Sequence, residues 1–366
     1  MEGLKLMIAG GGTGGHLYCG LAIAEEWKAR FGTVIFVGTP QGLEVKLVPA
    51  YQHPLILIRM APLKGKFFLA RLKALFWLPY AMGKSFLVLI KEKPNVVLGI
   101  GGYVSGPFVL VARMFGFKTA VIDQNAIPGF TNRLLGKWVH LVFLTFEGSQ
   151  KFFSQKKIRF FGNPVLKERV PINPRLRQDF GGQARLPSKP LLLICGGSQG
   201  AHVLNETMLK LYPKLVREFP HLVIVHQTGP TDFDNMQMEA QKISDHIEIK
   251  SYIDNMAHYY RLATCVVARS GAGTITELAL WGLASILIPY PFAADDHQLF
   301  NARELEKKKA AFIVEQKNID LENLFSLIKK ILSDDDLRKT MEHNAKQLAK
   351  PRAASDVAES LKELCE

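Results

Sequence analysis

Three times along this chain, an apolar run of strand length ends in a group of glycines and then passes into residues with helical spacing. The runs are Leu4–Ala9, Pro190–Cys195 and Thr264–Ala268. Such strand–turn–helix units predict parallel strands joined by helices, because neighbouring parallel strands require a crossover connection. We therefore expect an α/β fold.

The glycine-rich turns also indicate two similar halves. GGTGGH at residues 11–16 is loosely repeated as GGSQGAH at residues 196–202. Between the halves, residues 162–190 hold five prolines and the pair Gly181-Gly182, which is typical of a linker. A length of 366 residues is enough for two domains of ordinary size.

The third glycine-rich turn gives the strongest indication of a ligand. Arg269–Thr274 follows a predicted strand, helical spacing begins at Ile275, and Gly282 closes the helix. Unpaired N–H groups at a helix N-terminus suit a phosphate or diphosphate. We expect Glu277 in the first turn, either accepting hydrogen bonds from ribose hydroxyls or folding back on Thr274 as a capping box. Both alternatives stay open on this segment alone.

The next predicted loop favours the ligand. Tyr290–His297 follows a strand end, and Gln298 and Asn301 then stand on one helical face. Side-chain amides beside a diphosphate site suit a sugar. The segment therefore predicts a site for a nucleotide sugar.

Two formal motifs would indicate a dinucleotide site and a metal site, but the residues around them argue against both. Gly10, Gly12 and Gly15 match the dinucleotide fingerprint, yet the second strand ends in Gly38-Thr39-Pro40 without the acid that would hold a ribose. Asp232 and Asp234 spell DxD, but they do not follow a strand, which favours a loop or a cap. We expect no cofactor.

The cysteines give no sign of a metal site either. They lie far apart and form no CxxC pair, which argues against zinc and against disulfides and fits a reducing compartment: Cys19, Cys195, Cys265 and Cys365. The N-terminus lacks the pattern of a signal peptide, and no apolar run is as long as a membrane span. We therefore predict a metal-independent protein of the cytoplasm.

Positive charge is concentrated in the first half. Residues 1–163 hold 20 Lys and Arg against 7 Asp and Glu, which accounts for the whole net charge of +13. An acidic partner is expected there: anionic lipid, a phosphorylated substrate or nucleic acid. Nucleic acid is disfavoured, because the basic residues are not interleaved with aromatics and no recognised module is present.

Within that half, residues 64–93 combine apolar and basic side chains. The segment has seven Lys and Arg, one acid, and aromatic residues that include Phe68, Phe76 and Trp77. It predicts either an ordinary amphipathic helix on a sheet or a surface that docks on an anionic membrane.

An ordered set of motifs closely resembles the MurG family, the UDP-N-acetylglucosamine:lipid-linked muramyl-pentapeptide N-acetylglucosaminyltransferases of peptidoglycan synthesis. The motifs are GGTGGH, GGYVSGP, DQNAIPGFTNRLL, GNPV, GGSQGAHVLN, RSGAGTITE and PYPFAADDHQLFNA. The resemblance implies two Rossmann-like domains facing across a cleft (GT-B). Residues 1–163 would be the acceptor- and membrane-facing domain, 164–350 would bind the donor, and 351–366 would return to the first domain.

The resemblance also implies roles for individual residues. Donor UDP-N-acetylglucosamine would meet Ser198 with a phosphate, the Ile253 backbone with uracil and Glu277 with ribose. The diphosphate would lie on Ala272, Gly273, Thr274, Ile275 and Thr276, and the sugar on Gln298 and Asn125. The lipid I acceptor would enter near Thr13, Gly14, Gly15, His16 and Tyr103.

The implied reaction is an inverting transfer to the acceptor 4-hydroxyl at the cytoplasmic face of the inner membrane. It needs a general base, for which His16 is the first candidate and Asp123 the second. Three positions depart from the family, which commonly has proline at Cys19, glutamate at Asp123 and arginine at Leu166. Whether Lys167 replaces that arginine stays open, and an epimerase of UDP-N-acetylglucosamine is the enzymatic alternative.

Overall fold

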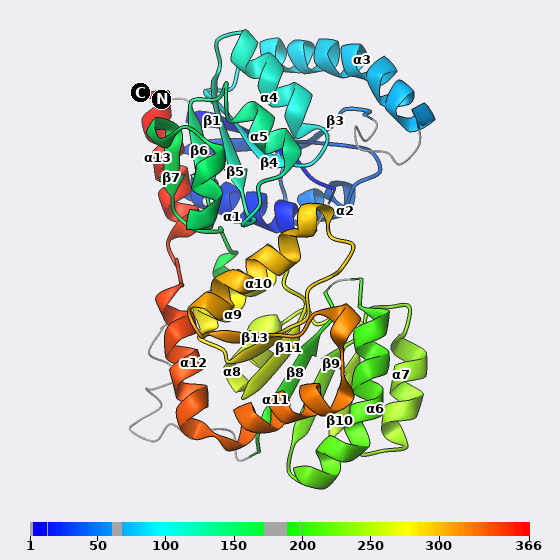
Figure 1. Cartoon of the computed structure of the whole chain (residues 1–366). Helices are drawn as coiled ribbons and strands as arrows, with labels where there is room; N and C mark the ends of the chain where they lie inside the picture. The colour runs from blue at the N-terminus through cyan, green and yellow to red at the C-terminus, as the bar shows by residue number, and fades with distance from the viewer. Residues whose placement is uncertain (1–2, 13, 61–67, 172–188, 198) are drawn as a thin grey trace. The chain divides into compact units, whose positions relative to one another are not determined.

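The computed structural model describes residues 3–12, 14–60, 68–171, 189–197 and 199–366, with only the backbone of 68–76. The chain divides into two compact units, Met1–Leu166 with Lys350–Glu366, and Lys167–Ala349. Each unit is built on a parallel sheet of its own (Figure 1).

The first unit contains a seven-stranded sheet in the order β3-β2-β1-β4-β5-β6-β7. Its strands are β1 (Leu4–Gly10), β2 (Gly32–Gly38), β3 (Leu55–Leu57), β4 (Val96–Gly101), β5 (Lys118–Asp123), β6 (Leu141–Leu144) and β7 (Ile158–Phe160). In β1, Leu6 pairs with Val34 of β2 and with Val96 of β4, both in parallel. The central strands are buried along nearly their whole length, as expected for a sheet covered on both faces.

Helices cover both faces of this sheet. They are α1 (Gly14–Arg30), α2 (Glu44–Ala50), α3 (Phe68–Glu92), α4 (Ser105–Met114), α5 (Phe130–Leu135) and α13 (Ala353–Cys365). Because side chains alternate along a strand, Leu6 and Ile8 pack with α1 and α13, whereas Met7 and Ala9 pack with α3, α4 and α5. Each fully buried apolar side chain contributes about 1.5–3 kcal/mol to folding.

The C-terminal helix belongs to the first unit. It lies along α1, where Arg30 donates hydrogen bonds to Ser355 at 2.9 Å and to Glu359 at 2.5 Å (Figure 1). Val357 and Leu361 are fully buried in the same apolar cluster as the α1 side chains. The last helix is therefore part of this unit's core.

The second unit contains a six-stranded parallel sheet in the order β10-β9-β8-β11-β12-β13. Its strands are β8 (Leu191–Cys195), β9 (Val223–Gln227), β10 (Ile247–Lys250), β11 (Cys265–Ala268), β12 (Ser285–Leu287) and β13 (Ala311–Ile313). Its helices are α6 (His202–Glu218), α7 (Phe233–Gln241), α8 (Met256–Leu262), α9 (Ala272–Trp281), α10 (His297–Lys307), α11 (Leu321–Ser333) and α12 (Asp335–Gln347). One apolar cluster joins the sheet to α6, α7 and α11.

Both sheets reverse their strand order at one place, between β1 and β4 in the first unit and between β8 and β11 in the second. In open parallel sheets, ligands bind beyond the carboxyl ends of the strands at such a switch point. All four strands at the two switch points are followed by the glycine-rich turns of the sequence. The topology therefore brings the predicted motifs together within each unit.

No described helix has both the length and the apolar character needed to cross a membrane. The longest helix, α3, has Pro79 inside it. Its side chains from Trp77 onward are described, whereas those of Phe68 and Phe76 lie outside the described residues.

Candidate active site

In the first unit, the turns after β1 and β4 touch. The N–H of Gly11 donates to the carbonyl of Gly101 at 3.3 Å. Gly101 has a φ of +95°, and a side-chain carbon there would lie 3.0 Å from Nε2 of His16. Glycine at this position therefore lets the imidazole of His16, in the first turn of α1, lie against the end of β4.

A buried carboxylate, that of Glu44, holds the turn that follows β1. Glu44 is 1% exposed, and its oxygens accept hydrogen bonds from the Gly12 N–H at 3.0 Å and from the Thr39 N–H at 2.7 Å. The hydroxyl of Thr39 donates a third bond at 2.8 Å. Glu44 thus ties the end of β2 to the turn that leads to His16. No motif in the sequence marks Glu44 as part of this site.

Asp123, at the end of β5, is also bound within its own loop. Its oxygens accept from the N–H of Asn125 at 3.0 Å, the N–H of Gly129 at 3.0 Å and the side-chain amide of Asn132 at 2.9 Å. Burial raises its pKa to about 6, against the lowering effect of these hydrogen bonds. The geometry is that of a carboxylate that shapes the loop 125–129.

The other predicted residues of this unit lie around the same edge. Gly14, Gly15 and His16 begin α1, and Gly15 is exposed. Tyr103 is 45% exposed in the turn before α4. Thr13 lies outside the described residues.

In the second unit, α9 starts three residues earlier than the sequence predicted. It begins at Ala272, with Gly271 as its N-cap, so the prediction of a start at Ile275 was wrong. Among the described residues no side chain caps this end, and the first N–H groups can serve a ligand. The predicted C-terminus is confirmed, since Gly282 adopts a left-handed conformation with a φ of 60°.

The earlier start also corrects the environment of Glu277. This residue lies in the second turn of α9, so Thr274 and Glu277 are both inside the helix and form no capping box. Glu277 is 8% exposed. Its Oε1 accepts from Arg169 Nη1 at 3.0 Å, and its Oε2 accepts from the hydroxyl of Tyr260 at 2.9 Å. The cap alternative is therefore excluded.

Gln227, at the end of β9, links two predicted ligand segments. Its amide donates to the carbonyl of Gly197 at 2.9 Å and accepts from the N–H of Ile253 at 3.0 Å. The Ile253 N–H is therefore already paired, and only its carbonyl can serve a ligand. Ser198, the next residue in the sequence after Gly197, lies outside the described residues.

The start of α10 is tied to the strand end before α9. The side chain of Gln298 accepts from the N–H of Tyr290 at 3.0 Å, and its backbone carbonyl accepts from the hydroxyl of Ser270 at 2.8 Å. The amide of Asn301 donates to the Ser270 carbonyl at 3.3 Å. Gln298 thus keeps its NH₂ group, the donor end of the amide, for another partner.

The remaining predicted positions have structural explanations. Leu166 is 1% exposed in the core of the first unit, and Lys167 is exposed. Asp232 accepts from the Asn205 amide at 2.7 Å and contacts His202 at 3.1 Å. Among the described residues, no group of three or more His, Cys, Asp or Glu side chains is arranged to hold a metal ion.

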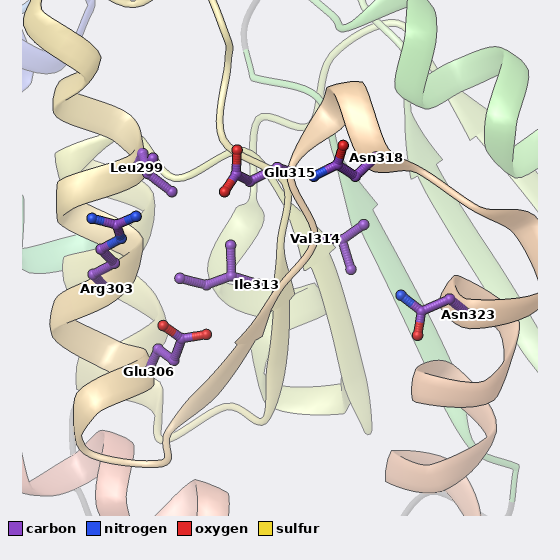
Figure 2. Close-up of a pocket in the computed structure, with 8 residues that line it drawn as sticks. All are labelled: Leu299, Arg303, Glu306, Ile313, Val314, Glu315, Asn318 and Asn323. Atoms are coloured by element: carbon purple, nitrogen blue, oxygen red, sulfur yellow. The ribbon is translucent and has the colours of Figure 1, made fainter.

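A cavity of about 260 Å³ opens elsewhere in the second unit, between α10, β13 and α11 (Figure 2). Arg303 and Glu306 reach it from α10, and Glu315 from the segment after β13. None of the predicted site residues lines it. Its mixed charges show no arrangement for a diphosphate, so the glycine-rich turns remain the candidate site.

Comparison with known proteins identifies the class. The N-terminal domain model of glycosyltransferase family 28 matches residues 6–144, and the C-terminal domain model of that family matches residues 191–357. Each unit has a parallel sheet with a switch point of the kind found in nucleotide-binding folds, and each unit is matched by a domain model of the family. The protein is therefore a family 28 glycosyltransferase. The prediction of an α/β fold with two Rossmann-like units is confirmed.

Relatives narrow the class to one family. A UDP-N-acetylglucosamine–N-acetylmuramyl-(pentapeptide) pyrophosphoryl-undecaprenol N-acetylglucosamine transferase of Myxococcus xanthus is 40% identical over 97% of this chain and 92% of its own length. A protein of the same name from Geotalea daltonii is 37% identical over 98% and 97%. The crystal structure of Acinetobacter baumannii MurG matches with a TM-score of 0.79 and 30% identity, covering 98% of this chain and 99% of that one. The chain belongs to the MurG family.

The fold alone is shared more widely. A crystal structure of a UDP-N-acetylglucosamine 2-epimerase matches with a TM-score of 0.67 but only 16% identity, over 98% of this chain and 96% of that one.

Proposed function

We propose that this protein transfers N-acetylglucosamine from UDP-N-acetylglucosamine to the 4-hydroxyl of the muramyl sugar of lipid I, which gives lipid II. The observation that carries the proposal is the full-length similarity to transferases of that name, joined to an uncapped helix start in the second unit. The reaction would take place at the cytoplasmic face of the inner membrane.

The second unit would bind the donor. The N–H groups at the start of α9, with Ala272–Thr276, would hold the diphosphate, together with Ser198. Glu277 would accept the ribose hydroxyls. Because Gln227 already takes the Ile253 N–H, the Ile253 carbonyl would accept from the N3–H of uracil. The free NH₂ group of Gln298 would donate to the sugar, and Asn125 of the first unit would also contact it.

The first unit would bind the acceptor and remove its proton. The acceptor oxygen attacks the anomeric carbon, the bond from that carbon to UDP breaks, and the hydroxyl proton passes to a base. His16 is the proposed base, because it begins α1 beside the turn after β4. Asp123 would act by holding the loop that carries Asn125, since its own oxygens already accept three hydrogen bonds. Thr13, Gly14, Gly15 and Tyr103 would line the acceptor.

Transfer of labelled N-acetylglucosamine from UDP to purified lipid I tests the proposal. We expect labelled lipid II to form at an unchanged rate in excess chelator, because helix N–H groups rather than a divalent ion would stabilise the leaving diphosphate. Epimerised or hydrolysed donor without lipid II would contradict the transfer. Loss of turnover in chelator that Mg²⁺ or Mn²⁺ restores would contradict metal independence and make Asp232 a candidate ligand.

We also propose that the first unit docks on anionic membrane. Exposed apolar side chains gather on α3, the end of α4 and the α5 segment, where Arg113 of α4 donates to the Trp138 carbonyl at 2.9 Å. These side chains are Leu87, Ile90, Met114, Phe115, Phe130, Leu134 and Trp138. Exposed Lys84, Lys91 and Lys137 lie on the same segments. Each basic residue near the surface contributes about 1 kcal/mol toward anionic lipid.

The double variant Leu87→Ser plus Trp138→Ser should lose sedimentation with anionic vesicles at low salt. Both side chains are more than half exposed, at 61% and 58%, so the fold should persist. UDP affinity reports that the second unit is intact. The matched control is Met238→Ser on α7, also 58% exposed, which should sediment like wild type. Unchanged sedimentation of the double variant would place the docking surface elsewhere.

A further inference from the structure

The carboxylate of Glu277 is held from two sides by residues that the sequence motifs do not include. Arg169 reaches one oxygen and the hydroxyl of Tyr260 reaches the other, at 3.0 Å and 2.9 Å. The main chain of Arg169 is fixed as well, because its carbonyl accepts from the indole N–H of Trp281 at 2.8 Å. Side chain and backbone of Arg169 are thus both attached to α9.

Tyr260 can act here only as a donor. It is 2% exposed, and burial, followed by the charge of Glu277, raises its pKa well above the ordinary value. The phenol therefore keeps its proton and directs it at Oε2. With Arg169 on Oε1, the carboxylate is restricted to one orientation.

Acceptor capacity remains for a ligand. The two oxygens of a carboxylate offer about four lone-pair positions, and these two contacts use one on each oxygen. The remaining positions are enough in number to accept from the two vicinal hydroxyls of a ribose. Holding the acceptor in one orientation lowers the cost of ordering it when a ligand binds.

We propose that Arg169 and Tyr260 are positioning residues that fix Glu277 to read the ribose hydroxyls, and so set the preference for a ribonucleotide donor over a deoxyribonucleotide. This inference rests on the proposed donor site. It also gives a role to the segment that follows Leu166. The guanidinium at this site comes from Arg169, whereas Leu166 is in the core and Lys167 is exposed.

The test compares the affinities for UDP and 2′-deoxy-UDP by calorimetric titration. Wild type should bind 2′-deoxy-UDP about tenfold more weakly, because a hydrogen bond to a charged group is lost. Arg169→Met should weaken UDP binding by about tenfold and 2′-deoxy-UDP binding by less than about threefold, so that the two affinities converge. Arg169→Lys should restore part of the difference, and Tyr260→Phe should reduce it.

A matched control separates positioning from stability. Arg338 is also a buried arginine of the second unit, 4% exposed and 2.7 Å from Asp335. Arg338→Met should lower the melting temperature as Arg169→Met does, but should keep the wild-type ratio of the two affinities. The ratio is measured on folded molecules, so a loss of stability alone does not change it.

Other outcomes would overturn the inference. An equal loss for both nucleotides in Arg169→Met would show that Arg169 supports the fold only. Tighter UDP binding in Arg169→Met would show that Arg169 competes with the ribose. If wild type binds both nucleotides equally while still forming lipid II, Glu277 does not read the 2′-hydroxyl and the proposed function stands. If wild type binds no UDP, the proposed donor site itself is wrong.

Discussion

Replacing His16 by alanine is expected to lower the turnover of lipid I by about 100-fold or more, because a positioned general base typically contributes about 10²–10⁴ in rate. The affinity for UDP should stay within about twofold of wild type, since the proton moves only during the reaction. His16 lies in the first unit, at the start of α1, whereas the proposed UDP contacts lie in the second. Single-turnover rates at saturating donor and a UDP titration measure the two effects.

His16→Gln separates proton transfer from positioning. Glutamine can still form hydrogen bonds with the acceptor, but it cannot take a proton at neutral pH. We therefore expect it to be as slow as His16→Ala. Turnover near wild type in His16→Gln alone would mean that His16 orients the acceptor, and near-normal turnover in both variants would mean that the base is elsewhere.

The sheets, and the edges at which their glycine-rich turns lie, could be predicted because their signals are local. Leu4–Ala9 and Pro190–Cys195 are apolar runs that end in glycine, and both are strands followed by helices in the structure. Parallel pairing then places the turns after neighbouring strands at one edge. The glycine-rich turns therefore lie at the switch points, as the sequence pattern predicts, and a ligand at these edges stays a prediction.

The start of α9 could not be predicted with the same rule. Gly271, Ala272 and Gly273 have no apolar periodicity, and glycine has a poor helix propensity, so the pattern begins only at Ile275. In the structure Gly271 is the N-cap, and Ala272 and Gly273 begin the first turn. The late predicted start placed Glu277 in the first turn of the helix, whereas it lies in the second, and this led to the capping-box alternative.

The contacts of the Glu277 and Glu44 carboxylates could not be predicted, because their partners are distant in the sequence. Arg169 is 108 positions from Glu277, and Glu44 is 32 positions from Gly12. A lone arginine in a proline-rich linker, or a lone glutamate after a strand, has no pattern that indicates a partner. Asp123 is the second candidate base from its place at a strand end, and that role stays a prediction; the hydrogen bonds from its own loop to both oxygens could not be predicted from that place.

Removing the carboxylate of Glu44 is expected to destabilise the first unit strongly. Glu44→Ala removes the buried carboxylate that accepts three hydrogen bonds from Gly12 and Thr39, and each hydrogen bond to a charged group contributes about 1.5–3 kcal/mol. We expect a loss of about 3 kcal/mol or more in the free energy of unfolding, measured by urea denaturation. Glu44→Gln should lose less, because its amide oxygen can still accept from the N–H and hydroxyl of Thr39 while its NH₂ group faces the Gly12 N–H.

Replacing Glu44 should also slow catalysis, because Glu44 holds the turn that precedes α1. That turn leads directly to His16, so folded Glu44→Gln should turn over lipid I more slowly and still bind UDP normally in the second unit. The control is Glu92→Ala, which breaks the partly exposed pair of Glu92 with Lys5 at 3.3 Å in the same unit. A surface pair contributes at most about 1 kcal/mol, and this one is remote from the turn, so turnover should not change. Equal stability of Glu44→Ala and Glu92→Ala would show that the turn keeps its shape without the carboxylate, and the positioning of His16 would then require another source.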